Sequence, residues 1–124
     1  MANKYRGEVS IRLDRMRVLK FTFNAFAEFE AMTGNSIQGA FADSDNLGFG
    51  TMRQLLWAGL IHEDPSLTVS KVGELMEFAD GSNLTEKVTA ITEQVVKAVQ
   101  YAFTDPDDDK PEKDDAESKK KPKG

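Results

Sequence analysis

The segment from Leu55 to Leu75 constrains the fold more than any other part of the chain. It contains two short runs of apolar residues at helical spacing, separated by Glu63-Asp64-Pro65. Proline fixes its own φ angle and has no N–H group to continue a helix, so the first helix has to end and the chain has to turn. No arrangement of side chains suited to catalysis accompanies these runs. The segment predicts two helices that meet at a sharp corner, and it favours binding over catalysis.

The first of these helices carries more apolar surface than a single stripe. We expect it to begin at Thr51, with apolar residues at helical spacing at Met52, Leu55, Leu56, Gly59 and Leu60. Trp57 and Ile61 widen this surface well beyond that stripe. Because a surface helix usually presents one apolar stripe to the core, this helix is either deeply buried or partly covered by something else.

Capping residues place the two helices that follow the corner. Thr68 can cap a helix that continues through Phe78 and Ala79 and ends at Asp80-Gly81. Asn83, with Glu86 three residues later, resembles a capping box at the start of the last helix. The last helix has the clearest pattern in the chain, since its apolar residues recur at steps of three and four, at Leu84, Val88, Ile91, Val95 and Val99.

The N-terminal part alternates between apolar and polar residues, which predicts a β-hairpin with one buried face. The inward positions are Val9, Ile11 and Leu13 in the first strand and Leu19, Phe21 and Phe23 in the second. The turn at Asp14-Arg15-Met16-Arg17 lacks the glycine that the tightest hairpin turns prefer, so we expect a longer connection. Asn24 can then cap a helix over 25–33 that Gly34-Asn35 ends, and a short helix over 36–42 precedes a glycine-rich loop.

These elements predict an α+β fold, with an N-terminal β-hairpin followed by a mostly α-helical domain of four to five helices. A chain of 124 residues that is 40% hydrophobic and 30% charged suits one such domain. We place this globular domain at 1–104. After Thr104 the only apolar side chain is Ala116, and three of the four prolines lie there, so we expect 105–124 to be a disordered charged tail.

Composition excludes several classes of protein. Without cysteine the chain can form no disulfide framework, zinc ribbon or thiol nucleophile, and a reducing, intracellular setting fits it best. The net charge of −5 argues against a nucleic acid as the main partner. No apolar run reaches the length of a membrane span, and no apolar signal segment follows Arg6. We therefore expect no nucleic acid and no membrane among the partners.

Residues that could support chemistry are few. His62-Glu63-Asp64 groups three titratable side chains, but a single histidine is a weak ligand set for a transition metal. The series Asp105, Asp107 and Asp109 matches the start of a calcium loop, yet Lys110 and Ala116 stand where the loop requires glycine and glutamate. We predict no catalytic residue, no metal site and no cofactor.

A binding role depends instead on the aromatic residues. The candidate contacts with a partner are Phe41, Phe49, Trp57, Ile61 and Phe78. Aromatic residues at helical spacing more often belong to a core than to a groove, and both interpretations stay open here. Burial of Trp57 distinguishes them: a ring packed wholly inside makes the segment a scaffold, and a partly exposed ring beside Ile61 makes it the first candidate contact.

Three stretches of the sequence resemble the small tail assembly chaperones of long-tailed bacteriophages, especially those of prophages and gene transfer agents. They are Arg6-Gly7-Glu8-Val9, the run from Phe21 to Glu30 (FTFNAFAEFE), and the segment from Leu55 to Leu75. The resemblance covers about 6 to 80, in the order strand, strand, helix, loop, helix, helix. It consists of fold residues and includes no catalytic signature.

The resemblance implies a non-enzymatic factor that binds the long, helical tape measure protein and assists tail tube polymerisation. Such a factor keeps its partner soluble and helps to recruit the tail tube protein. It acts in the host cytoplasm during virion assembly and is absent from the mature particle; self-association is left open. Some relatives are labelled as tail tube proteins, so the alternative is a structural tail component such as a tail tube or minor tail protein. The helical pattern after the hairpin favours the chaperone.

The lysine run near the C-terminal end suggests a further hypothesis, which concerns translational frameshifting. Family members are commonly made in two lengths through translational frameshifting, and Lys119-Lys120-Lys121 is a run that an A-rich slippery sequence would encode. The tail also separates its charges, with eight acidic residues in 105–117 and four lysines in 118–124. A solvated, flexible end accounts for the lysines without any frameshift.

Overall fold

The computed structural model describes residues 3–42 and 48–104. Within these ranges the predicted α+β architecture is confirmed, with a two-stranded antiparallel hairpin followed by helices. The elements are the 3₁₀ helix η1 (Lys4–Arg6), the strands β1 (Val9–Arg12) and β2 (Met16–Leu19), and the helices α1 (Phe23–Thr33), α2 (Ile37–Ala42), α3 (Phe49–Leu60), α4 (Val69–Met76) and α5 (Leu84–Phe103). The predicted tail, 105–124, lies outside the described residues.

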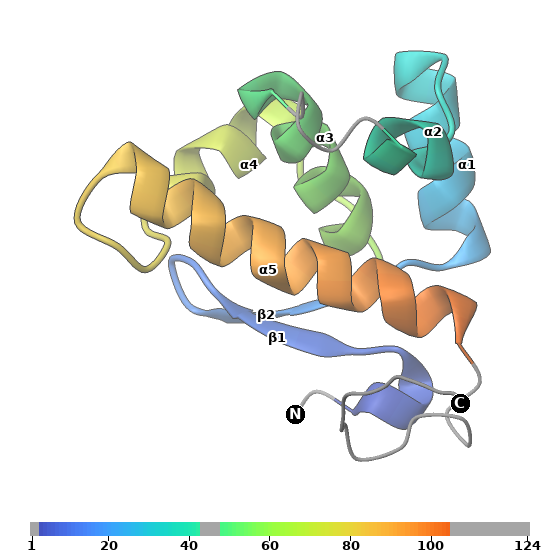
Figure 1. Ribbon diagram of the computed structural model, residues 1–124, viewed down its shortest axis with the longest axis horizontal. Coiled ribbons are helices and arrows are strands. Elements are labelled where there is room, and N and C mark those ends of the chain that lie inside the picture. Colours follow the sequence, from blue (N-terminus) through green and yellow to red (C-terminus); the bar gives the residue numbers. More distant parts are fainter. Residues whose placement is uncertain (1–2, 43–47, 105–124) are drawn as a thin grey trace, which may run out of the picture.

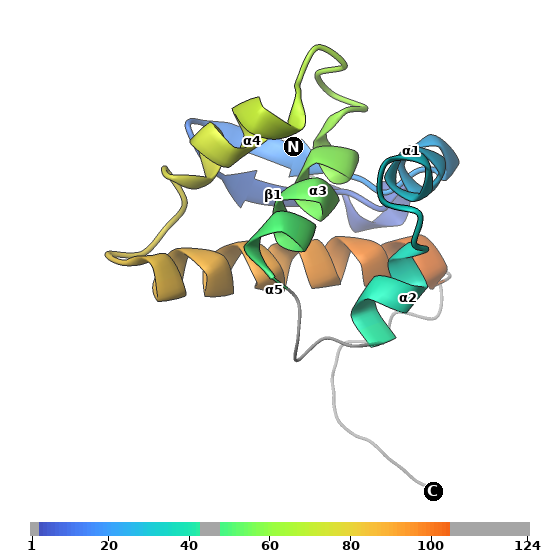
Figure 2. The same ribbon diagram turned by 90° about the horizontal axis from the view of Figure 1, so that it is seen from above.

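The helices cover one face of the hairpin. In Figure 1, α5 runs along the length of the hairpin, which lies beneath it. Of the two strands, α5 contacts β1 more than β2, and α3 contacts β2. Seen from above in Figure 2, α4 lies near the start of α5, and α1 and α2 lie near its end. The core fills the space between these layers. Its largest fully buried side chains are Leu19, Phe29, Ile37, Met52, Leu55, Leu56, Leu60, Val72, Ile91 and Val95.

The hairpin has the predicted pattern of alternating burial, with one polar exception. Val9 pairs with Leu19, and Ile11 pairs with Arg17. All four of these side chains are buried, so an arginine occupies an inward position of β2. The strands are joined by three residues, 13–15, which is longer than the tightest turn, as expected. Met16 and Arg17, which we assigned to the turn, belong to β2.

The second strand ends earlier than its alternation predicted. Phe23 is the first residue of α1 and is 95% exposed, so its assignment to the buried face of a strand was wrong. The predicted cap was wrong for the same reason, because Thr22 replaces Asn24 as N-cap, and its Oγ1 accepts a hydrogen bond from the Ala25 N–H at 3.1 Å. Threonine and asparagine are both good caps, and the earlier one starts the helix two residues sooner than expected.

The C-terminal end of α3 covers the outer edge of β2. The Lys20 N–H donates to the Gly59 carbonyl at 3.0 Å, and His62 Nε2 donates to the Val18 carbonyl at 2.9 Å. Gly59 permits this approach, since a Cβ at that position would lie 2.8 Å from Leu19 Cδ2. His62, to which we assigned no role, therefore helps to join a helix end to the sheet.

The last two helices begin at the predicted caps. Thr68 Oγ1 accepts from the Lys71 N–H at 3.0 Å, and Asn83 Oδ1 accepts from the Glu86 N–H at 2.9 Å. The Glu86 carboxylate accepts from the backbone and hydroxyl of Ser82, both at 2.8 Å, so the full capping box does not form. α4 ends at Met76, three residues before the predicted end, and the chain continues in tighter turns.

Candidate functional site

The structure does not gather the five predicted contact residues into one site. Phe49 begins α3 and is 64% exposed, whereas Phe78 follows α4 and is 62% exposed. Phe41 is half-buried in α2. Phe49 lines one hollow of the surface, Phe41 lines another, and Phe78 lines neither of these two. Their role in binding stays a prediction.

Trp57 and Ile61 belong to the corner between α3 and α4. The Trp57 ring is half-buried against the core, and its Nε1–H donates to the Leu67 carbonyl at 3.0 Å. Ile61 is half-buried too, and its N–H donates to the Trp57 carbonyl at 3.2 Å. The indole N–H of Trp57 thus forms its hydrogen bond within the domain. This bond holds α3 to the segment that follows Pro65 and stabilises the corner. This geometry gives Trp57 a structural part. Because its ring is only half-buried and lies beside the half-buried Ile61, Trp57 also stays the first candidate contact.

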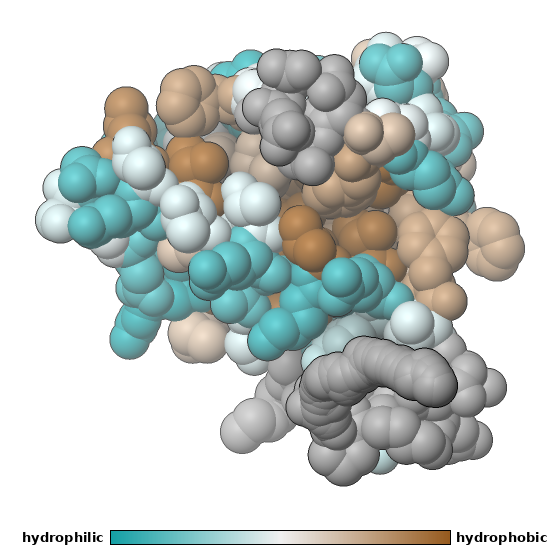
Figure 3. Space-filling model, viewed as in Figure 1, coloured by the Kyte–Doolittle hydropathy of each residue, from teal (hydrophilic) through white to brown (hydrophobic). Residues whose placement is uncertain are grey.

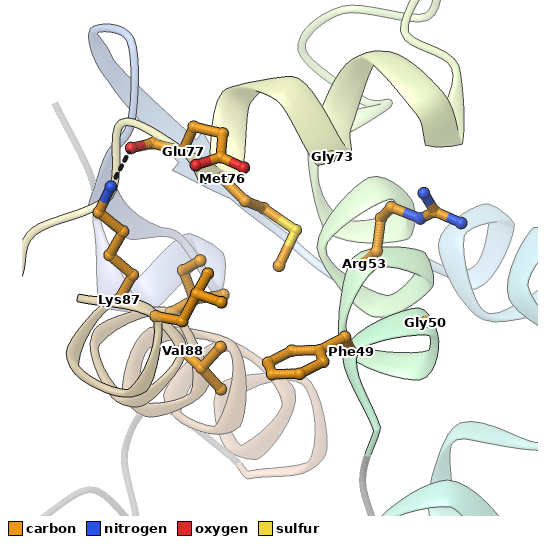
Figure 4. Close-up of a pocket in the computed structure, with 10 residues that line it drawn as sticks. Phe49, Gly50, Arg53, Gly73, Met76, Glu77, Lys87 and Val88 are labelled. Atoms are coloured by element: carbon orange, nitrogen blue, oxygen red, sulfur yellow. Dashed lines mark hydrogen bonds between the residues drawn. The ribbon is translucent and has the colours of Figure 1, made fainter.

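A first groove lies between α3, α4 and α5, and we call it the α3–α5 groove. It has a volume of about 330 Å³, and its lining includes Phe49, Arg53, Met76, Leu84, Lys87 and Val88. Figure 4 shows the side chains of Phe49, Met76 and Val88 directed into the shared space. Lys87 Nζ donates to the Glu77 carbonyl at 2.6 Å. The groove thus combines an apolar floor with charged groups at its edges.

A second apolar region lies where α1 and α2 meet the end of α5. It consists of two adjacent hollows, of about 670 and 280 Å³, which share Gln38 and Phe103. In Figure 3 apolar residues gather over this part of the molecule. We call this region the aromatic surface and define it by Phe21, Phe23, Phe26, Phe41, Val96 and Phe103.

Three rings form a row across the aromatic surface. The Phe26 ring centroid lies 6.0 Å from that of Phe21 and 5.3 Å from that of Phe103, with tilted planes, which is a favourable arrangement for aromatic pairs. Phe103 is 56% exposed and Phe23 is almost completely exposed. Sequence reasoning assigned Phe23 to a strand and overlooked Phe103. Three phenylalanines within 21–26 are the signal that could have revealed this surface, because a short segment cannot bury them all.

Apolar side chains line most of both regions, together with a few polar or charged ones. The polar residues lining the aromatic surface include Thr22, Glu30, Gln38 and Gln100, and those lining the α3–α5 groove are charged residues without a hydroxyl or imidazole. The described residues contain no group of three or more histidine, aspartate or glutamate side chains that could hold a metal ion. The Asp105, Asp107 and Asp109 series lies outside the described residues.

No helix within 3–42 and 48–104 is both long and apolar enough to cross a membrane. Comparisons of the chain with protein family models, with curated proteins and with solved structures find no match. The functional interpretation therefore depends on the resemblance carried by the residues quoted above and on the two apolar regions.

Proposed function

We propose that this protein is a phage tail assembly chaperone, which binds the tape measure protein without any enzymatic activity and assists tail tube polymerisation. The observation that carries the proposal is the large apolar side chains that the described domain leaves exposed. They include Phe23, Phe49, Phe78, Leu84 and Phe103. The family resemblance supplies the identity of the partner.

Exposed apolar side chains of this size support a binding role on energetic grounds. Removing apolar surface from water contributes about 25 cal/mol per Å², so each exposed phenylalanine is a source of binding free energy once a partner covers it. Single exposed apolar residues are ordinary, but four of these five border hollows, Phe49 and Leu84 in one and Phe23 and Phe103 in another. An amphipathic helix that lays its apolar face into a groove uses this geometry. The tape measure protein is expected to present long helices of this kind.

Co-expression with the tape measure protein of the same phage tests the proposal. We expect the chaperone to raise the soluble fraction of that protein and to co-purify with at least one of its segments. A matched experiment with an unrelated long helical protein controls for general solubilisation. Failure of every tape measure segment to co-purify contradicts the proposal. Polymerisation of the protein alone into rings or tubes, together with its presence in purified virions, would instead identify a structural tail component.

A further inference from the structure

We infer that the outer edge of β1 is a docking site for an extended segment of another protein, which pairs with β1 as a third strand. Ser10 and Arg12 provide the backbone groups for this pairing. The site goes beyond the proposed function and does not rest on it, because it uses the backbone of the hairpin and not the exposed aromatic side chains.

The hydrogen bonds of β2 show which backbone groups of β1 face outward. The Val18 carbonyl and the Lys20 N–H both bond to the C-terminal end of α3, so they point away from β1. In an antiparallel pair, two opposite residues either exchange both hydrogen bonds or both face outward, and the two kinds of pair alternate. Ser10 lies opposite Val18, and Arg12 lies opposite Met16. The N–H and C=O groups of Ser10 and Arg12 therefore face the outer edge of β1.

These four backbone groups are open to a partner. Within 3–42 and 48–104, none of them forms a hydrogen bond with another group of the protein. The two edges of the sheet thus differ, since the end of α3 closes the edge of β2 and no described residue pairs with the edge of β1. An unpaired row of N–H and C=O groups is a template for the backbone of another chain. Extended peptides bind sheet edges in this way.

A hollow of about 360 Å³ borders this edge. The strand side of its lining consists of Ser10, Ile11, Arg12 and Met16, and α5 contributes Ala90, Ile91, Glu93 and Gln94. Successive side chains of a strand point to opposite faces, so every second side chain of an added strand would enter the hollow. Because Ile11, Ala90 and Ile91 make part of its lining apolar, these side chains should be apolar and of moderate size.

A second copy of this chain fits the edge poorly. Of the two strands, α5 contacts β1 more than β2, so α5 lies over the side of the hairpin that carries the open edge. Two paired β1 strands would lie about 4.8 Å apart, whereas two packed helices need about 8–10 Å between their axes. The two α5 helices would therefore occupy the same space. A single extended segment without a covering helix avoids this conflict.

Three fluorescent heptapeptides of alternating threonine and valine test the pairing with the full-length protein. One is unmodified, the second carries N-methyl groups on its threonines, and the third carries them on its valines. N–H groups alternate between the two edges of a strand, so only one methylated set can face β1. We expect one methylated peptide to bind at least about tenfold more weakly than the parent peptide and the other to bind like the parent, measured by anisotropy. No binding of the parent, or equal weakening by both modifications, overturns the inference.

Hydrogen exchange of single amides locates the bound peptide. In the free protein the N–H groups of Ser10 and Arg12 should exchange faster than those of Val9 and Ile11, which face β2. The parent peptide should slow exchange of the first two amides by about tenfold or more and leave the other two unchanged. If the Ser10 and Arg12 amides are already protected in the free protein, another part of this chain or a second copy occupies the edge, and the inference is overturned.

A variant tests the edge from the side of the protein. Ser10→Pro removes an N–H that β2 does not use, and proline is tolerated on edge strands. We expect Ser10→Pro to bind the parent peptide at least about tenfold more weakly, whereas the matched control Ser10→Ala keeps the N–H and should bind like wild type. Circular dichroism and melting temperature establish that both variants fold. Equal binding by the two variants overturns the assignment.

Two further results keep the alternatives apart. The methylated peptides require no change in the protein, so they decide the question even if Ser10→Pro does not fold. Sedimentation of the wild-type protein over a range of concentrations tests for a dimer. A dimer that Ser10→Pro dissociates and Ser10→Ala retains would assign the edge to a second copy and overturn the inference.

Discussion

Arg17 holds Asp14 through two parallel hydrogen bonds, with Nε donating to Oδ1 at 2.8 Å and Nη2 donating to Oδ2 at 3.0 Å. The arginine side chain is only 7% exposed, although it lies in a two-stranded sheet. Its Nη1 lies 4.0 Å from Asp64 Oδ2, at the corner between α3 and α4. One cation therefore connects the hairpin turn with a loop that is distant in the sequence.

The Arg17–Asp14 pair predicts a pH dependence of stability. The hydrogen bond from Arg17 lowers the pKa of Asp14 below its ordinary value of about 4. A carboxyl group whose pKa is lower in the folded state stabilises that state above the ordinary pKa, and the contribution is lost as the pH falls through the folded value. Melting temperatures between about pH 7 and pH 2 should fall more for wild type than for Asp14→Asn. An identical decline in both proteins would contradict this.

Replacing Arg17 should destabilise the domain. Arg17→Ala leaves Asp14 without its charged partner and removes a buried side chain, so we expect the free energy of unfolding to fall by about 2 kcal/mol. Chemical denaturation measures it. Arg12→Ala is the control, because Arg12 lies in the same sheet with an exposed side chain and should change stability by less than about 0.5 kcal/mol.

Two glycines of α3 should respond differently to alanine. A Cβ at Gly59 would lie 2.8 Å from Leu19 Cδ2 and 3.0 Å from Phe21, so Gly59→Ala forces β2 and α3 apart and should cost about 1–3 kcal/mol. A Cβ at Gly50 meets no atom within 4 Å, so Gly50→Ala should leave stability unchanged or raise it by up to about 1 kcal/mol. Equal effects in thermal denaturation would show that the α3–β2 contact is looser than described.

Trp57→Phe separates structure from binding at the α3–α4 corner. The variant keeps an aromatic ring but loses the donor to the Leu67 carbonyl, which should lower the free energy of unfolding by about 1 kcal/mol. Phe78→Ser should have no comparable effect on stability, because Phe78 is exposed. If Trp57→Phe instead weakens capture of the tape measure protein at unchanged stability, Trp57 is a contact residue, as the sequence allowed.

Local signals were sufficient for much of the fold. Thr68 and Asn83 cap the predicted helices. A cap requires only a side-chain oxygen and a backbone N–H group a few residues later in the sequence. The spacing of the apolar residues in α5 likewise predicts a single long helix that packs on one face. Such features depend on neighbours in the sequence, and a pattern in the sequence can predict them.

The errors arose where distant elements decide the outcome. Phe23 continues the apolar–polar alternation of β2, but the strand ends at Leu19. At that point Leu19 and Phe21 pack closely against Gly59 of α3, and the chain leaves the sheet before Phe23. Arg17 is buried because Asp14 and Asp64 converge on it, and the second of these comes from another part of the fold. The aromatic surface combines α1, α2 and α5, which no local pattern relates.

The ring row has a consequence for the order in which the protein becomes functional. Phe21 and Phe26 leave the ribosome well before Phe103, which ends the last described helix. A nascent or shortened chain without α5 lacks the wall that completes the larger hollow. The proposed chaperone would thus complete this part of its surface only after α5 has been synthesised.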